Sequence, residues 1–230
     1  MIQIAVSGIY GKTGGELISS AEKNKNFKIV FGVDGKGVSN GDIPVYKSFA
    51  EAESAGKTCD GIIDFSSPSA LGDILAFAKK HKVFAVFATT GYDEDDKKEI
   101  EKASLIIPVC VTENASRGIA AIKEILPALH FALKDYPITI TEIHNKNKKD
   151  APSGTAIALN ALLLGEGKIT SIREGDVKGI HTIVFSNGEE EVSVTHKAFS
   201  RGIFADGALK IAENLYKKSA GLYNARGEKI

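Results

Sequence analysis

The amino-terminal segment Ile2-Gln-Ile-Ala-Val-Ser-Gly-Ile-Tyr-Gly-Lys-Thr-Gly14 indicates the fold of this chain. Residues 2–6 have the apolar composition of a buried strand, and an apolar repeat over residues 17–21 predicts a helix. Gly8, Gly11 and Gly14 lie between them, the middle one a place later than in G-x-G-x-x-G. Glycines let a backbone turn tightly and approach a pyrophosphate at a helix start, although such turns can also serve packing alone.

An acidic residue follows the second predicted strand. Asp34 comes directly after residues 27–33 and lies twenty positions beyond Gly14. A carboxylate there can accept hydrogen bonds from both hydroxyls of an adenosine ribose and would repel a 2′-phosphate. We therefore expect a dinucleotide site that prefers NADH, with NADPH still usable because Lys36 could reach a phosphate. The alternative is that Asp34 only opens the turn formed by residues 34–37.

Strand and helix patterns alternate through the first half of the chain. They cover residues 61–65, 70–80, 83–87, 94–102 and 105–109. Such alternation predicts a Rossmann-like, doubly wound α/β domain with a parallel sheet. Its ligand crevice lies outside the carboxyl ends of the strands. The residues expected there are Gly8, Ser66, Thr89, Thr90 and Asn114, although each alone is more often only a polar strand end.

The pattern changes after Asn114. One long helix, residues 116–133, precedes a strand at 138–143, and a strong hairpin signal, Asn187-Gly188, joins two later strands. Runs of strands predict an α+β domain built on an open mixed sheet. We therefore assign residues 1–114 and 202–230 to a dinucleotide-binding domain. Residues 115–201 are assigned to a substrate-binding and oligomerisation domain.

The segment Glu142-Ile-His-Asn-Lys-Asn-Lys-Lys-Asp-Ala-Pro-Ser-Gly-Thr-Ala156 is the strongest functional signal. His144 ends a predicted strand, and its imidazole can give up a proton near neutral pH. Ser153 is a plausible helix entry, where free N–H groups attract carboxylate or phosphate, and Lys148 can add a charge. The pattern indicates an anion site beside an acid. The alternative is a solvated basic turn.

Residues 142–156 closely resemble the signature of the 4-hydroxy-tetrahydrodipicolinate reductase family, also called dihydrodipicolinate reductases, and the resemblance spans essentially the whole chain. It implies NAD(P)H-dependent reduction of a cyclic dicarboxylate with loss of water, in lysine biosynthesis through diaminopimelate. It implies His144 and Lys148 as catalytic residues, with substrate contacts from Asn145, Ser153, Gly154 and Thr155. The implied cofactor contacts are Gly8, Ile9, Tyr10, Gly11, Lys12, Thr13, Gly14, Asp34, Ser66, Ala88, Thr89, Thr90, Thr112, Glu113, Asn114 and Ala115.

The chain departs from this family at several positions. Asn145 stands where many members have a second histidine, and it can donate a hydrogen bond but cannot titrate. Gly35 replaces an arginine that holds the NADPH phosphate in many members. Ala88, Ala115 and Arg117 also differ, which predicts a cofactor pocket of altered shape.

A strand-rich segment of longer members is missing between residues 173 and 181. The resemblance nevertheless implies a homotetramer built by the sheets of the second domain. His81, His130, His181 and His196 are expected to be structural, because a satisfied core or surface histidine is commoner than a catalytic one.

Bulk properties favour a cytoplasmic enzyme. The 230 residues are 43% hydrophobic, enough for a core, and the formal net charge of zero argues against nucleic acid as a main partner. No apolar stretch approaches a bilayer span, and no secretory signal pattern is seen, so no membrane association is expected. Cys59 and Cys110 lack metal-ligand spacing, so we expect reduced thiols and no metal.

Two other functional classes stay open. A different Rossmann-type dehydrogenase of amino or imino acids would not need Lys148 at this spacing from Ser153. A non-enzymatic NAD sensor would keep the glycines and Asp34 but would have no reason to retain His144.

Overall fold

The computed structural model describes residues 1–37 and 41–230, which form two compact units. The first unit consists of residues 1–115 and 204–230, and the second of residues 116–203. The boundaries expected from the sequence, 114/115 and 201/202, lie within two residues of these. Because the second unit is inserted into the first, the chain returns after residue 203 to complete the sheet that residue 2 begins.

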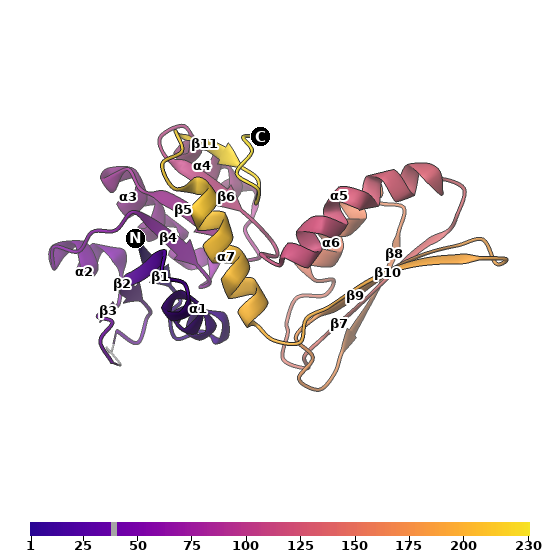
Figure 1. The fold of residues 1–230 in the computed structure, drawn as a ribbon, viewed down its shortest axis with the longest axis horizontal. Helices are drawn as coiled ribbons and strands as arrows, with labels where there is room; N and C mark the ends of the chain where they lie inside the picture. Colours follow the sequence, from indigo (N-terminus) through magenta and orange to yellow (C-terminus); the bar gives the residue numbers. More distant parts are fainter. Residues whose placement is uncertain (38–40) are drawn as a thin grey trace. The chain divides into compact units, whose positions relative to one another are not determined.

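A seven-stranded sheet forms the centre of the first unit, with strand order β11-β6-β5-β4-β1-β2-β3 (Figure 1). Each pair of neighbouring strands described in it is parallel. The strands are β1 (Ile2–Ser7), β2 (Phe27–Val33), β3 (Val45–Tyr46), β4 (Gly61–Asp64), β5 (Phe84–Phe87), β6 (Pro108–Val111) and β11 (Gly221–Tyr223). The order reverses beside β1, which creates the switch point at which α/β sheets bind ligands.

Helices cover both faces of this sheet. They are α1 (Lys12–Lys23), α2 (Phe49–Ser54), the short 3₁₀ helix η1 (Pro68–Ala70), α3 (Leu71–His81), α4 (Glu94–Ser104) and α7 (Gly202–Leu215). Successive strand residues point to opposite faces, so Ile63 packs with α1 and α7 whereas Ile62 packs with α2, α3 and α4. The predicted doubly wound fold is confirmed.

One predicted strand was placed too early. Residues 105–109 read as a strand, but helix α4 continues to Ser104 and the strand β6 starts only at Pro108. The amide of Ile107 still bonds to the carbonyl of Ala103 in a helical turn, and Leu105 is 81% exposed. The apolar run therefore spans a helix end and a strand start, which periodicity alone cannot separate.

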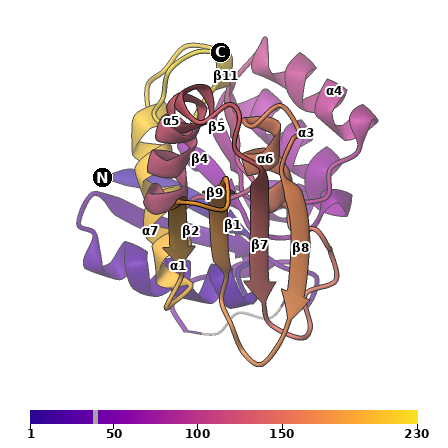
Figure 2. The same ribbon diagram turned by 90° about the vertical axis from the view of Figure 1, so that its right-hand side faces the viewer.

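The second unit is built on a four-stranded mixed sheet with strand order β10-β9-β7-β8. Figure 2 shows β9, β7 and β8 of this sheet. The elements of the second unit are α5 (Arg117–Ala132), β7 (Ile138–His144), α6 (Gly154–Ala161), β8 (Lys168–Arg173), β9 (Ile180–Ser186) and β10 (Glu191–Lys197). Strands β7 and β8 are parallel, and the other two pairings are antiparallel. The predicted mixed sheet and its hairpin, β9–β10, are confirmed.

The two faces of this second sheet differ. Ile140 and Ile183 lie on the buried face and pack with residues of α5 and α6. The opposite face, which we call the open face, is only partly buried within this unit. It contains Thr139, Thr141, Ile143, Thr170, Ile172, Thr182, Val184, Ser193 and Thr195. Among the described residues, no helix has both the length and the apolar character needed to cross a lipid bilayer.

Candidate active site

The glycine turn after β1 is tightly built. Gly8 has a φ of +74°, its amide donates to the carbonyl of Val33 at 2.8 Å, and the amide of Gly11 donates to the carbonyl of Gly8 at 2.9 Å. A Cβ at Gly14 would lie 2.2 Å from the Gly8 carbonyl oxygen. Gly11 is the N-cap of α1 and has no side chain to cap the first amides. This geometry fits a dinucleotide pyrophosphate, which binds such uncapped amides.

The predicted ribose-binding carboxylate lies beside this turn. One carboxylate oxygen of Asp34 accepts from the amide of Tyr10 at 3.3 Å, and the other accepts from the amide of Lys36 at 3.2 Å. The fold thus brings the end of β2 to the glycine turn that follows β1, as the sequence predicted.

Asp64, at the end of β4, organises the neighbouring loops. It is fully buried and accepts hydrogen bonds from the hydroxyls of Ser66 and Tyr92, the latter at 3.1 Å. The hydroxyl of Ser7 donates to that of Ser66 at 3.1 Å. Burial raises the pKa of Tyr92, so its phenol stays protonated and keeps donating to the carboxylate. The predicted contact Ser66 is therefore fixed against the strand that precedes the glycine turn.

The other predicted cofactor residues follow the strands in the same way. Thr90 is exposed after β5, and the hydroxyl of Thr112 donates to the carbonyl of Asn114 at 2.9 Å after β6. Ile9 and Ala115 are 1% and 6% exposed and belong to the apolar core, so any contact from them involves mainly their backbone. Of the remaining predicted residues, Lys12 and Thr13 form the start of α1, and Ala88, Thr89 and Glu113 lie in the loops after β5 and β6.

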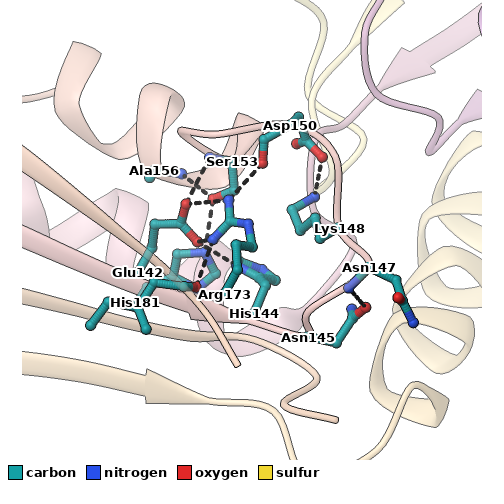
Figure 3. Close-up of polar contacts among 11 residues, drawn as sticks. Glu142, His144, Asn145, Asn147, Lys148, Asp150, Ser153, Ala156, Arg173 and His181 are labelled. Carbon is teal, nitrogen blue, oxygen red and sulfur yellow. Dashed lines mark hydrogen bonds and ion pairs between the residues drawn. The ribbon is translucent and has the colours of Figure 1, made fainter. Parts of the chain in front are cut away.

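In the second unit, Glu142 is the centre of a buried polar cluster (Figure 3). Its side chain is fully buried, and one oxygen accepts from Nδ1 of His144 and, at 2.8 Å, from Arg173. The other oxygen accepts from Arg173 at 2.7 Å and from the amide of Ser153 at 3.1 Å. Glu142 and His144 are two residues apart on β7, so both side chains point to the same face of the sheet. The cluster therefore joins the predicted acid to the predicted carboxylate-binding loop.

Burial and neighbouring charges together set the pKa values of Glu142 and His144. Burial raises the pKa of Glu142, but hydrogen bonds, led by those from Arg173, outweigh it and hold the pKa at about 2. Burial lowers the pKa of His144, and attraction to Glu142 offsets only part of that effect. The charges of Lys148 and Arg173 lower it further. In the free protein at neutral pH, the carboxylate is ionised and the imidazole is mostly neutral.

His181 lies closer to this cluster than its predicted structural role suggested. Its ring packs edge-on against that of His144, with centroids 5.1 Å apart, and its Nε2 is 3.4 Å from the hydroxyl of Ser153. Burial lowers the pKa of His181 to about 3, so it stays neutral. Of the other three histidines, His81 contacts Glu53 and His130 contacts Glu166, whereas His196 contacts Ser116 and has its ring centroid 6.2 Å from that of His181.

Lys148 and the start of α6 surround a carboxylate already present in the chain. Nζ of Lys148 is 2.8 Å from Asp150. Burial raises the pKa of Asp150, but hydrogen bonds from Lys148 and the amide of Gly154 lower it below its usual value. The backbone carbonyl of Asn145 accepts a hydrogen bond from the amide of Lys148 at 3.0 Å. The side-chain oxygen of Asn145 accepts one from the amide of Asn147 at 3.1 Å. The loop is therefore folded around an anionic group.

Ser153 has a more structural position than the sequence indicated. It is 1% exposed, its hydroxyl accepts from the amide of Ala156 at 3.3 Å as the N-cap of α6, and its own amide is taken by Glu142. Its hydroxyl proton is the donor that remains, and it lies 3.4 Å from Nε2 of His181. Thr155 is also buried, at 5% exposure.

Sequence reasoning did not include Glu142 and Arg173 in the candidate site, although the structure places both in its buried polar cluster. Glu142 had a usable signal, because an acidic residue two positions before His144 must share its face of the strand. Arg173 had none, because its place depends on the pairing of β8 with β7, which sets Arg173 opposite His144.

Family models described as "Dihydrodipicolinate reductase, N-terminus" and "Dihydrodipicolinate reductase, C-terminus" match residues 2–115 and 118–227. The 4-hydroxy-tetrahydrodipicolinate reductase of Pelagibacter ubique is 35% identical, over 98% of this chain and 96% of the relative. That of Caldanaerobacter subterraneus subsp. tengcongensis is 34% identical, over 97% and 96%.

Solved structures agree on the fold. A dipicolinate-bound dihydrodipicolinate reductase from Paenisporosarcina sp. has a TM-score of 0.76 at 19% identity, covering 97% of both chains. Aspartate dehydrogenase from Thermotoga maritima has a TM-score of 0.59 at 14% identity, covering 95% of this chain and 98% of that one. At such identities these structures show the fold alone. Because the family models match nearly the whole sequence and the relatives exceed 30% identity, this chain belongs to the dihydrodipicolinate reductase family.

Proposed function

We propose that this chain reduces 4-hydroxy-tetrahydrodipicolinate to tetrahydrodipicolinate, with loss of water, in lysine biosynthesis through diaminopimelate. The single observation that supports this most is the buried Glu142–His144 pair beside the loop of Lys148 and Ser153, in a chain of this family. A nicotinamide cofactor held by the glycine turn and Asp34 would supply the hydride, and C4 of the conjugated imine that remains after loss of water would accept it.

His144 supplies the proton in this proposal. Because its Nδ1–H is directed at the Glu142 carboxylate, Nε2 is the nitrogen left to donate to C3 of the enamine formed by hydride addition. Binding of a doubly anionic substrate would raise the pKa of His144, because opposite charge favours the imidazolium. The acid would thus become protonated when the substrate is present.

Lys148, Gly154 and Thr155 would bind the substrate carboxylates, with the hydroxyl of Ser153 as a further donor. Lys148 and the amide of Gly154 already contact the carboxylate of Asp150, which supports an anion-binding role for this loop. A substrate carboxylate would compete with Asp150 for the same donors. Asn145 would contribute a hydrogen bond but no charge.

Purified protein given the product of dihydrodipicolinate synthase is expected to oxidise NADH, with a higher kcat/KM than for NADPH. The physical reason is that Asp34 can accept from the ribose hydroxyls and repels a 2′-phosphate. A coupled absorbance assay with each nucleotide measures both quantities. NADH binding without turnover would favour a non-enzymatic NAD sensor. Turnover of an amino acid instead would favour another dehydrogenase. A clear preference for NADPH would contradict the role of Asp34.

The pH dependence should identify the acid. Because His144 must be protonated and its pKa in the free protein is lowered, kcat/KM is expected to fall as pH rises through a value below 6.5. The kcat should persist to higher pH, because bound substrate raises that pKa. Initial rates from pH 5 to 9 at low and saturating substrate measure the two profiles. A kcat/KM that rises over this range would contradict the assignment.

We further propose a homotetramer that forms through the open face of the second sheet. Threonine and branched aliphatic side chains occupy the middle of this face, with Lys168, Glu191 and Lys197 at strand ends, and the hydroxyls of Thr182 and Thr195 lie 3.1 Å apart across it. Sedimentation velocity is expected to give four times the chain mass of 24.5 kDa. Val184→Lys, which puts a charge on this face, should lower the mass. A monomer for the unsubstituted chain would exclude this assembly.

A further inference from the structure

The buried ion pair between Glu142 and Arg173 has more hydrogen bonds than packing alone requires. An ionised carboxylate can accept about four hydrogen bonds, and four are directed at Glu142, with the side chain of Ser171 as a further partner. Two come from the guanidinium of Arg173, at 2.8 and 2.7 Å, one from His144 and one from the amide of Ser153. Two of the partners, His144 and Ser153, are therefore residues of the proposed active site.

Arg173 extends the connection to the lysine of the loop. Its second nitrogen also donates to the carbonyl of Asp150 at 2.6 Å, and the Asp150 carboxylate is 2.8 Å from Nζ of Lys148. One guanidinium thus touches the residue that orients His144 and the residue that pairs with Lys148. Its planar fork suits this task, because it fixes two carboxylate oxygens at once, which a lysine cannot do.

We propose that Arg173 and Glu142 are positioning residues that select the Nδ1–H tautomer of His144 and align its free Nε2 with the carboxylate-binding loop. The inference rests on the proposed function of His144. An ionised carboxylate only accepts, so the imidazole must keep a proton on Nδ1 and present Nε2 to a ligand. Arg173 keeps Glu142 ionised and fixed in the interior.

The charged and titratable groups around His144 support this role. Glu142 on the same strand raises the pKa of His144, whereas Lys148 in the loop and Arg173 on β8 lower it. His181 on β9 is neutral and packs against the ring. Glu142 is thus the group that favours the imidazolium, and its loss should make His144 a poorer acid.

The test uses Glu142→Gln and Arg173→Lys in the full chain, with Glu166→Gln as the matched control. Glu166 also pairs with a histidine, His130 at 3.0 Å, but its carboxylate is exposed, unlike that of Glu142. We expect Glu142→Gln to lower kcat on the order of 100-fold with KM changed less than about threefold. Its kcat/KM profile should shift to lower pH. Arg173→Lys should lower kcat by a smaller factor, and Glu166→Gln should leave kcat, KM and the pH profile of kcat/KM unchanged.

Nitrogen-15 NMR of labelled histidine measures the tautomer and pKa of His144 without substrate. This readout separates the inference from the reaction: a changed tautomer in a chain that does not turn over the dicarboxylate would support positioning and refute the proposed function. Turnover with an unchanged tautomer, pKa and pH profile in folded Glu142→Gln would overturn the inference. If Glu142→Gln does not fold, Arg173→Lys provides the test. An unchanged population of the Nδ1–H tautomer of His144 and an unshifted pH profile of kcat/KM in Arg173→Lys would also overturn the inference.

Discussion

His144→Gln is expected to lower kcat by about 10²- to 10⁴-fold, the usual contribution of a general acid. Glutamine keeps a polar side chain of similar length but cannot deliver a proton near neutral pH. Binding of NADH should persist, because His144 belongs to the second unit and the glycine turn to the first. Steady-state rates and NADH fluorescence titration measure the two effects separately.

The control for this substitution is His130→Gln. His130 is a histidine of the same unit that hydrogen-bonds the exposed Glu166, and it lies on α5 rather than on β7. The His130→Gln substitution should leave kcat unchanged. Unaltered turnover in His144→Gln, or an equal loss in both variants, would contradict the role of His144 as the acid.

Gly14→Ala should disrupt the first unit and its nucleotide site. Alanine usually stabilises a helix relative to glycine, but here a Cβ would lie 2.2 Å from the carbonyl oxygen of Gly8 and 2.8 Å from that of Ile9. Since both are backbone atoms, the turn itself must move. We expect a loss of roughly 1–3 kcal/mol or more in the free energy of unfolding. NADH affinity should fall at least about tenfold, because the amides of the turn would no longer be aligned.

Gly15→Ala provides a control one position away in the same helix. A Cβ at Gly15 meets nothing within 4 Å, so this variant should gain up to about 1 kcal/mol from helix propensity and bind NADH normally. Denaturant unfolding and NADH titration of both variants test the pair. Equal behaviour of Gly14→Ala and Gly15→Ala would show that close approach in the turn is unimportant.

The sequence was sufficient for the parts of the fold that have their own pattern. The strand at residues 61–65 and the hairpin around Asn187-Gly188 were predicted because apolar periodicity and turn chemistry are local signals. The strands β3 and β11 were missed because they have two and three residues and exist through pairing with β2 and β6. Too few residues are present there for any periodicity.

The residues of the candidate site also differ in whether the sequence alone could group them. His144, Lys148 and Ser153 belong to one continuous segment, so the sequence could group them. Arg173 is 31 residues away from Glu142, and only the pairing of β7 with β8 brings the two together. The sequence also could not show that the amide of Ser153 is already bonded to Glu142, because this depends on a buried side chain in three dimensions.

The second unit separates the two sequence segments of the first unit, and this affects how the first unit folds during synthesis. When residues 1–115 leave the ribosome, β6 still lacks its partner β11, and the sheet face normally under α7 is bare. Almost the whole second unit must be translated before α7 begins at Gly202, which takes roughly 4–18 s at typical elongation rates. The nascent nucleotide unit is therefore exposed to aggregation throughout that interval, and a chaperone that shields apolar surface would act there.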